Sequence, residues 1–154
     1  MKLYLIRHGA AEAGSTDDIN RNLTARGENQ ALGAAKWLAK NIKGPVSLWV
    51  SPYLRTRQTA TPIAKALGIE FLEHKCLQPE MTPQKVVDEL CHEEKNIILV
   101  THLPLVGRLA SLLTEGVIFD QPWSPAEIWQ LEGDVFAPGC LTNVDVWYPV
   151  LDEG

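Results

Sequence analysis

A chain of 154 residues is long enough to form one domain with a substantial buried core. Hydrophobic residues make up 45% of it and charged residues 21%, as is typical of a soluble globular protein. Fourteen basic and nineteen acidic residues give a net charge of −5, which excludes the basic footprint of a nucleic-acid binder. We therefore expect a single domain over residues 1–154 that has no nucleic-acid partner.

The apolar stretches are too short for a membrane span, and the first is interrupted by Arg7-His8 before it reaches the length of a signal peptide. The three cysteines, Cys76, Cys91 and Cys140, lack C-x-x-C spacing, which is typical of reduced thiols in a cytosolic protein. We expect a cytoplasmic protein without membrane contact.

Hydrophobic periodicity predicts strands that alternate with helices along most of the chain. The expected strands cover about residues 2–7, 46–50, 69–72, 96–101, 127–131 and 142–148. The expected helices follow an N-cap at Thr24, cover about 53–67, begin at Thr82-Pro83, and cover about 104–114. This alternation favours an α/β fold with a mostly parallel sheet, helices on both faces, and an antiparallel edge formed by the last strands.

Three of the expected strands lead into cations or imidazoles. These are Arg7-His8-Gly9 after the first strand, Arg55 after Ser51-Pro52, and His102 after the fourth strand. Ligands of open α/β sheets bind outside the carboxyl ends of the strands, so we expect these side chains to share one pocket. Gly9 lets the backbone turn sharply or approach a ligand closely, and we count it among the substrate-binding residues.

The composition of this predicted pocket suits a phosphoryl group. Phosphoryl oxygens carry delocalised negative charge, and guanidinium forks match their geometry. A metal ion held by His8 and His102 is the competing interpretation, but Arg7 and Arg55 disfavour it because they add positive charge around a divalent cation. One imidazole can be the nucleophile if its reactive nitrogen is unprotonated and its other nitrogen has an acceptor. The second imidazole, when protonated, can stabilise the transferring group.

The two other histidines are given structural roles. His74 is expected near the end of the third strand, and His92 at a helix C-terminus, where it complements the partial negative charge. The neighbouring pair Cys91-His92 is not expected to bind a metal, because no matching pair with ligand spacing exists elsewhere in the sequence.

Taken together, the motifs resemble those of the histidine phosphatase (phosphoglycerate-mutase-like) superfamily. In order they are Arg7-His8-Gly9, Leu23-Thr24-x-x-Gly27, Ser51-Pro52-x-x-Arg55-x-x-Gln58-Thr59-Ala60, and His102 after an apolar strand. Within that superfamily, the small size and the stretch Thr101-His102-Leu103-Pro104-Leu105-Val106-Gly107 resemble the bacterial SixA-type phosphohistidine phosphatases. The resemblance covers nearly the whole chain and weakens after about Gly116.

The resemblance implies a three-layer α/β/α sandwich in which His8 becomes phosphorylated. It also implies that Arg7, Arg55 and His102 bind the phosphoryl group. Arg21 matches a position where SixA-type sequences carry arginine, which implies a place in the pocket; the alternative is a solvated loop cation. Neither a metal nor an organic cofactor is implied.

This sequence departs from larger superfamily members in the region after the third strand. Those members typically supply a carboxylic acid there as the proton donor. Here that region offers Glu80 without the usual flanking pattern, so Glu80 is either the general acid or a solvated loop carboxylate. A phosphohistidine leaves as imidazole, whose conjugate acid has a pKa of about 6.5, so it needs less acid assistance than an alkoxide. A pocket that binds the phosphoryl group well but has no clear proton donor favours cleavage of a P–N bond.

We therefore expect a monomeric phosphatase that acts on phosphohistidine in a signalling or phosphotransfer protein. A small-molecule phosphomonoesterase or mutase of the same fold, and a non-catalytic phosphate-binding regulatory module, are alternatives. The segment 117–125, with Phe119 and Trp123, is a candidate docking rim for the partner, unless its aromatic side chains pin the loop to the core.

Overall fold

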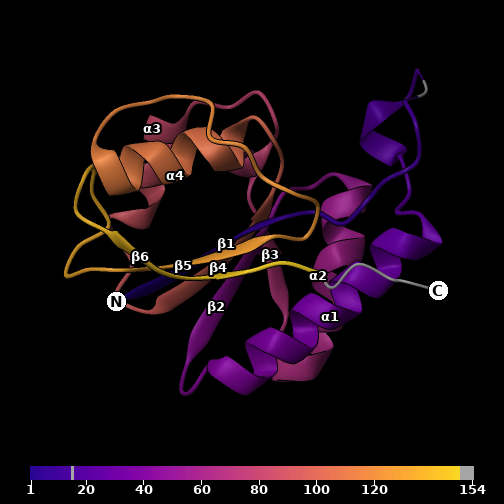
Figure 1. The fold of residues 1–154 in the computed structure, drawn as a ribbon, viewed down its shortest axis with the longest axis horizontal. Coiled ribbons are helices and arrows are strands. Elements are labelled where there is room, and N and C mark those ends of the chain that lie inside the picture. The colour runs from indigo at the N-terminus through magenta and orange to yellow at the C-terminus, as the bar shows by residue number, and fades with distance from the viewer. Residues whose placement is uncertain (15, 150–154) are drawn as a thin grey trace.

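A computed structural model describes residues 1–14 and 16–149 as a sheet between two layers of helices (Figure 1). The strands are β1 (Lys2–Arg7), β2 (Val46–Val50), β3 (Phe71–Glu73), β4 (Asn96–Thr101), β5 (Ile128–Glu132) and β6 (Thr142–Trp147). The α-helices are α1 (Ala25–Asn41), α2 (Leu54–Leu67), α3 (Pro83–Leu90) and α4 (Leu105–Glu115). Two short 3₁₀ helices, η1 (Asp18–Asn20) and η2 (Lys75–Leu77), follow β1 and β3.

The strand order in the sheet is β3-β2-β4-β1-β5-β6. The first four of these neighbours run parallel to one another, while β5 pairs antiparallel with both β1 and β6. The expected α/β/α sandwich with a mostly parallel sheet and an antiparallel edge is therefore confirmed. Within the described part of the chain, no helix is both long enough and apolar enough to cross a membrane.

Alternate residues of β1 supply both halves of the core. Leu3 and Leu5 pack with buried side chains of α3 and α4, whereas Tyr4 and Ile6 pack with those of α1 and α2. Successive side chains of a strand point to opposite faces, so a strand covered on both faces must be apolar at every position. This is why the run before Arg7 has no polar alternation.

The chain connections place a crevice between the ends of β1 and β4. From β1 the chain passes through α1 to β2 on one side, and from β4 it passes through α4 to β5 on the other. In Figure 1, α1 and α2 lie on one face of the sheet, and α3 and α4 lie on the opposite face. Neighbouring parallel strands whose connections leave in opposite directions define the usual ligand site of such sheets. His8 and His102 directly follow these two strands.

The third strand is shorter and later than the sequence predicted. It was expected over 69–72, but Ile69 donates its amide to Ala64 O and completes the end of α2, with Gly68 in the left-handed conformation. Only Phe71–Glu73 then pair with β2, at the exposed edge of the sheet. The other predicted strands and helices begin and end within a few residues of the observed ones.

A close backbone contact fixes the segment that follows β1 against α1. Thr24 caps α1 by accepting the Gly27 amide, as predicted, and its own amide donates to Ala10 O. A Cβ on Gly27 would lie 2.0 Å from Ala10 O, and one on Gly9 would lie 2.6 Å from Gly27 O. Gly9 is therefore required by the backbone of Gly27, and Gly27 by the backbone of Ala10.

Replacing Gly27 by Ala should destabilise the fold by at least about 1–3 kcal/mol, because the new methyl group meets backbone that cannot move independently of His8. Urea denaturation measures the change. Asn29→Ala, at an exposed position of the same helix, is the matched control and should change stability by no more than about 0.5 kcal/mol. Equal stabilities of the two variants would contradict the close contact.

Candidate active site

The imidazole of His8 is held in one tautomer by the residue that follows it. His8 is nearly buried, and its Nδ1 lies 2.7 Å from Gly9 O. A carbonyl oxygen can only accept, so Nδ1 carries the proton and Nε2 keeps a lone pair. Nε2 in turn accepts a hydrogen bond of 3.3 Å from Arg55 Nε. The acceptor that a nucleophilic imidazole requires is thus supplied by the backbone.

Burial keeps this imidazole neutral. Burial, together with the charges of Arg55, Arg7 and Arg21, lowers the pKa of His8 to about 3, although the hydrogen bond to Gly9 opposes the shift. At neutral pH the ring is therefore uncharged, and its Nε2 lone pair can attack an electrophile once Arg55 turns to the ligand.

His102 lies beside His8 and is completely enclosed. The two ring centroids are 5.3 Å apart, and His102 Nε2 is 2.8 Å from Ser51 Oγ. The Tyr53 amide donates to Ser51 Oγ, whose hydroxyl can either donate to Nε2 or accept from it, so the orientation of that hydroxyl sets which nitrogen of His102 carries the ring proton. Burial, followed by the charges of His8 and the arginines, lowers the pKa of His102, so this ring too is neutral without a ligand.

Two arginines reach the same crevice. Arg55, in the first turn of α2, is buried, and its Nη1 donates to Asp18 O at 2.7 Å. Arg7 Nη1 donates to Trp123 O at 2.7 Å. Burial and the repulsion between the two guanidinium groups lower the pKa of Arg7, while Glu127 partly offsets the effect. Excess positive charge is therefore gathered around the two histidines.

Among the described residues, two buried side-chain nitrogens have no hydrogen-bond partner: Arg7 Nε and His102 Nδ1. Both belong to residues at the His8 ring; Arg7 Nε is always a donor, and His102 Nδ1 is a donor when Ser51 donates to Nε2 or when the ring is protonated. Buried donors are nearly always satisfied in proteins, so their natural partner is an acceptor that binds here. An oxyanion supplies such acceptors together with the negative charge that the arginines favour.

An acidic residue that the sequence did not single out completes the cluster. The carboxylate of Asp18, in η1, lies 2.9 Å from Arg21 Nε and 3.4 Å from Arg55 Nη2. Partial burial disfavours its charge, but the charges and hydrogen bonds of Arg55 and Arg21 outweigh this and lower the pKa of Asp18. Asp18 is therefore a carboxylate at neutral pH. Arg21 is partly exposed and reaches the cluster through Asp18, so its predicted role in the pocket stays a prediction.

Of the other residues that the sequence predicted, Gly9 lies in the histidine cluster and Glu80 does not contact it. Gly9 lies inside the cluster, where its amide donates to Thr59 Oγ1 and its carbonyl accepts from His8. Glu80 is on an exposed turn after η2, and no hydrogen bond or ion pair of the described chain joins it to the histidines or arginines. The amide of Val106, in the first turn of α4, donates to His102 O and ties that helix to the second histidine.

The loop over 117–125 divides into a buried and an exposed part. Trp123 is buried, donates through Nε1 to Glu127 O and stacks on Trp129 with centroids 4.5 Å apart. Its carbonyl holds Arg7, so this aromatic pins the loop and positions the cluster. Phe119 is 41% exposed. The buried acid Glu127, missed from the sequence, braces the loop by accepting from Ser124 N and Trp129 Nε1.

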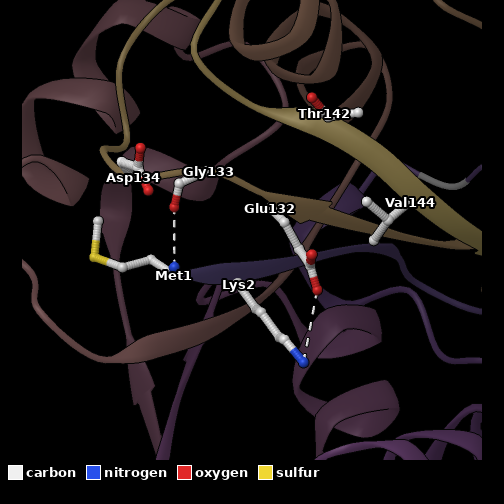
Figure 2. A pocket seen from close by; sticks show the side chains of 7 residues that line it. All are labelled: Met1, Lys2, Glu132, Gly133, Asp134, Thr142 and Val144. Carbon is white, nitrogen blue, oxygen red and sulfur yellow. Dashed lines mark hydrogen bonds and ion pairs between the residues drawn. The ribbon is translucent and has the colours of Figure 1, made fainter.

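A separate open pocket lies at the other end of β1 (Figure 2). It is lined by Met1, Lys2, Glu132, Gly133, Asp134, Thr142 and Val144. The Met1 ammonium donates to Gly133 O at 2.9 Å, and Lys2 pairs with Glu132 at 3.6 Å, so both cations already have a partner in the protein. The histidine cluster at the carboxyl ends of the strands is therefore the candidate site.

Comparison with known proteins agrees with this geometry. Residues 3–81 match the family model of the histidine phosphatase superfamily (branch 1). This chain belongs to the histidine phosphatase superfamily. It is 32% identical over 126 residues to a phosphohistidine phosphatase SixA homolog of Haemophilus influenzae, covering 73% of this chain and 77% of that protein.

The similarity extends to a second SixA protein and to a solved structure. The phosphohistidine phosphatase SixA of Escherichia coli is 29% identical over 124 residues, covering 75% of this chain and 76% of that protein. The structure of the protein histidine phosphatase SixA complexed with tungstate superposes with a TM-score of 0.84 and 25% identity, over 97% of each chain. The predicted resemblance is thereby confirmed.

The burial of His8 should make the fold less stable in mild acid. Below pH 6.5 the unfolded chain binds a proton on this imidazole and the folded chain does not, so stability falls from about pH 6.5 towards the folded pKa of about 3. The expected slope is about 1.4 kcal/mol per pH unit for each such histidine. Urea denaturation between these limits measures it.

Removing the imidazole should flatten this dependence. We expect His8→Asn to lose less stability per pH unit than the unmodified chain. The same substitution at exposed His92 is the control, because it removes no buried imidazole. If the two variants had the same pH slope, His8 would not be neutral in the folded protein.

Proposed function

We propose that this chain hydrolyses phosphohistidine on a partner protein, with His8 as the nucleophile. The observation that carries the proposal is the His8 ring itself, with its proton directed to Gly9 O and its unprotonated Nε2 beside Arg55. Both named relatives are phosphohistidine phosphatases, and the superposed SixA structure holds tungstate, a tetrahedral oxyanion.

In the proposed first step, His8 Nε2 attacks phosphorus, and the P–N bond to the substrate ring breaks. The substrate ring, protonated by solvent on its other nitrogen, leaves as neutral imidazole. Arg55 and Arg7 bind the phosphoryl oxygens, and His102 Nδ1–H donates to one of them. The arriving negative charge raises the pKa of His102 from its lowered value, so the ring can become cationic once the substrate is bound. Water then cleaves the phosphohistidine at His8 and releases phosphate.

The state of Asp18 supports a leaving group that needs little acid assistance. Asp18 is the carboxylate beside Arg55 and Arg21, and its lowered pKa makes it a poor proton donor near neutral pH. Glu80, the candidate from the sequence, lies on an exposed turn. An imidazole leaving group, with a conjugate acid of pKa about 6.5, fits a site without a good proton donor better than an alkoxide does.

The partner that we propose is a signalling or phosphotransfer protein that carries phosphohistidine. We propose that this chain acts on it as a monomer in the cytoplasm. A side chain presented on a protein surface needs an open site rather than a deep cavity. Asp18 and Arg21 lie at the rim, with the Asp18 side chain 55% exposed, so a protein-borne phosphohistidine could reach Arg55.

Incubation with a small phosphoramidate should give a phosphoenzyme that is labile in acid and stable in base, as a P–N bond requires. His8→Ala should abolish the adduct and lower turnover at least about 1,000-fold. Radiolabel transfer followed by acid and base treatment tests this, with His92→Ala as the control. An acid-stable adduct, or turnover by His8→Ala, would contradict the mechanism.

A turnover assay distinguishes a phosphohistidine phosphatase from a phosphomonoesterase and from a non-catalytic phosphate-binding module. Hydrolysis of a phosphoramidate should exceed that of an alkyl phosphate ester at equal concentrations, because only the ester needs a proton donor. A strong preference for the ester would instead favour a small-molecule phosphomonoesterase. Absence of any turnover by the unmodified chain would favour a phosphate-binding module.

Asp18 should compete with the bound oxyanion for Arg55 and Arg21. We expect Asp18→Asn to bind tungstate about threefold to fivefold more tightly, in line with an exposed ion pair worth up to about 1 kcal/mol. Isothermal titration calorimetry measures the affinity. Asp134→Asn, at the other end of the sheet, controls for the change in net charge. Weaker binding by Asp18→Asn would mean that Asp18 positions the arginines instead.

A further inference from the structure

A second cluster of potential ligands lies outside the candidate active site. His74 follows β3, Cys76 is in η2, and Glu89 extends from α3. One ligand atom of each residue lies within 4.8 Å of those of the other two. The sequence places Glu89 thirteen positions after Cys76, so only the packing of η2 against α3 brings the three together.

Two of the three side chains are held in place before any ligand binds. The His74 ring stacks on Trp49 with centroids 4.0 Å apart and planes at 14°, and its amide donates to Val50 O. Cys76 is buried, and the Leu77 amide closes the turn on His74 O. Glu89 is exposed and can rotate to close the remaining distance. The cluster is thus a rigid nitrogen–sulfur pair facing one adjustable carboxylate.

The electrostatic surroundings favour a cation. Burial, with the hydrogen bond and charge of Glu89, raises the pKa of Cys76 to about 12, and Lys85 opposes the shift. Burial lowers the pKa of His74, and the negative charges of Glu89 and Glu93 oppose that shift. The Glu89 carboxylate therefore acts on both neighbouring side chains, and a bound positive ion would offset its charge.

We infer that His74, Cys76 and Glu89 bind one divalent transition-metal ion, with Zn²⁺ the best match. Sulfur, imidazole nitrogen and carboxylate oxygen together are the donors of zinc sites, whereas Ca²⁺ and Mg²⁺ prefer oxygen alone. Three protein ligands leave a fourth tetrahedral position for water. These three residues take no part in the chemistry at His8.

The proposed ion would brace the segment that supports His102. Leu77 O, at the end of η2, accepts a 2.6 Å hydrogen bond from Thr101 Oγ1, and Thr101 directly precedes His102. An ion that joins η2 to α3 only in the folded chain stabilises that chain by mass action. The expected role is therefore structural, and a rise in melting temperature is its readout.

The test uses chelator-treated full-length protein titrated with ZnCl₂ in competition with a chromophoric chelator. We expect one equivalent to bind and the melting temperature to rise. Glu89→Gln, at an exposed position that should leave the fold intact, and His74→Gln should each weaken binding at least about tenfold. Asp88→Asn, which makes the same charge change at the neighbouring exposed position, should not.

Cobalt identifies the sulfur ligand. The Co²⁺-loaded protein should show thiolate-to-metal charge-transfer absorption that Cys76→Ser removes and that the double variant Cys91→Ser, His92→Gln retains. The proposal is overturned if no stoichiometric Zn²⁺ binds, if Glu89→Gln and His74→Gln bind as tightly as the unmodified chain, or if binding is lost only with Cys91 and His92. Circular dichroism confirms that each variant is folded.

Discussion

The hydrogen bond from His8 Nδ1–H to Gly9 O is the constraint on which the candidate site depends. It directs the ring proton away from the crevice and leaves the Nε2 lone pair beside Arg55. The bond in turn requires a backbone that passes Gly27 without a side chain at position 9. The glycines of two separated motifs, the cap of α1 and the tautomer of one imidazole are therefore parts of a single arrangement.

The arginines around the His8 ring are held in place by residues that do not contact the ring. Arg7 is held by the carbonyl of Trp123, and the loop that carries this carbonyl is braced by the buried carboxylate of Glu127. Arg55 is held by Asp18, which an incoming oxyanion would have to displace. The site thus keeps its cations oriented while leaving donors on Arg7 and His102 for a ligand.

Two clusters of side chains at the carboxyl ends of the strands suit different kinds of ion. At His8 the surroundings are cationic and suit an oxyanion, whereas Cys76 has the Glu89 carboxylate beside it, in the cluster that we propose binds a metal ion. Nothing in the sequence joins His74 and Cys76 to Glu89, because their spacing matches no ligand motif. Only the packing of η2 against α3 makes that cluster visible.

The amino-acid pattern was enough to predict the layers of the fold and which residues gather at the candidate site. Apolar runs such as Leu3–Ile6 favour strands covered on both faces, and residues after parallel strands meet at one edge of the sheet, where His8, Arg55 and His102 lie together. Tertiary structure alone decided the short third strand, the placement of Asp18 against Arg55 and the bracing by Glu127. These features depend on contacts between loops distant in the chain, and such contacts leave no periodic pattern in the sequence.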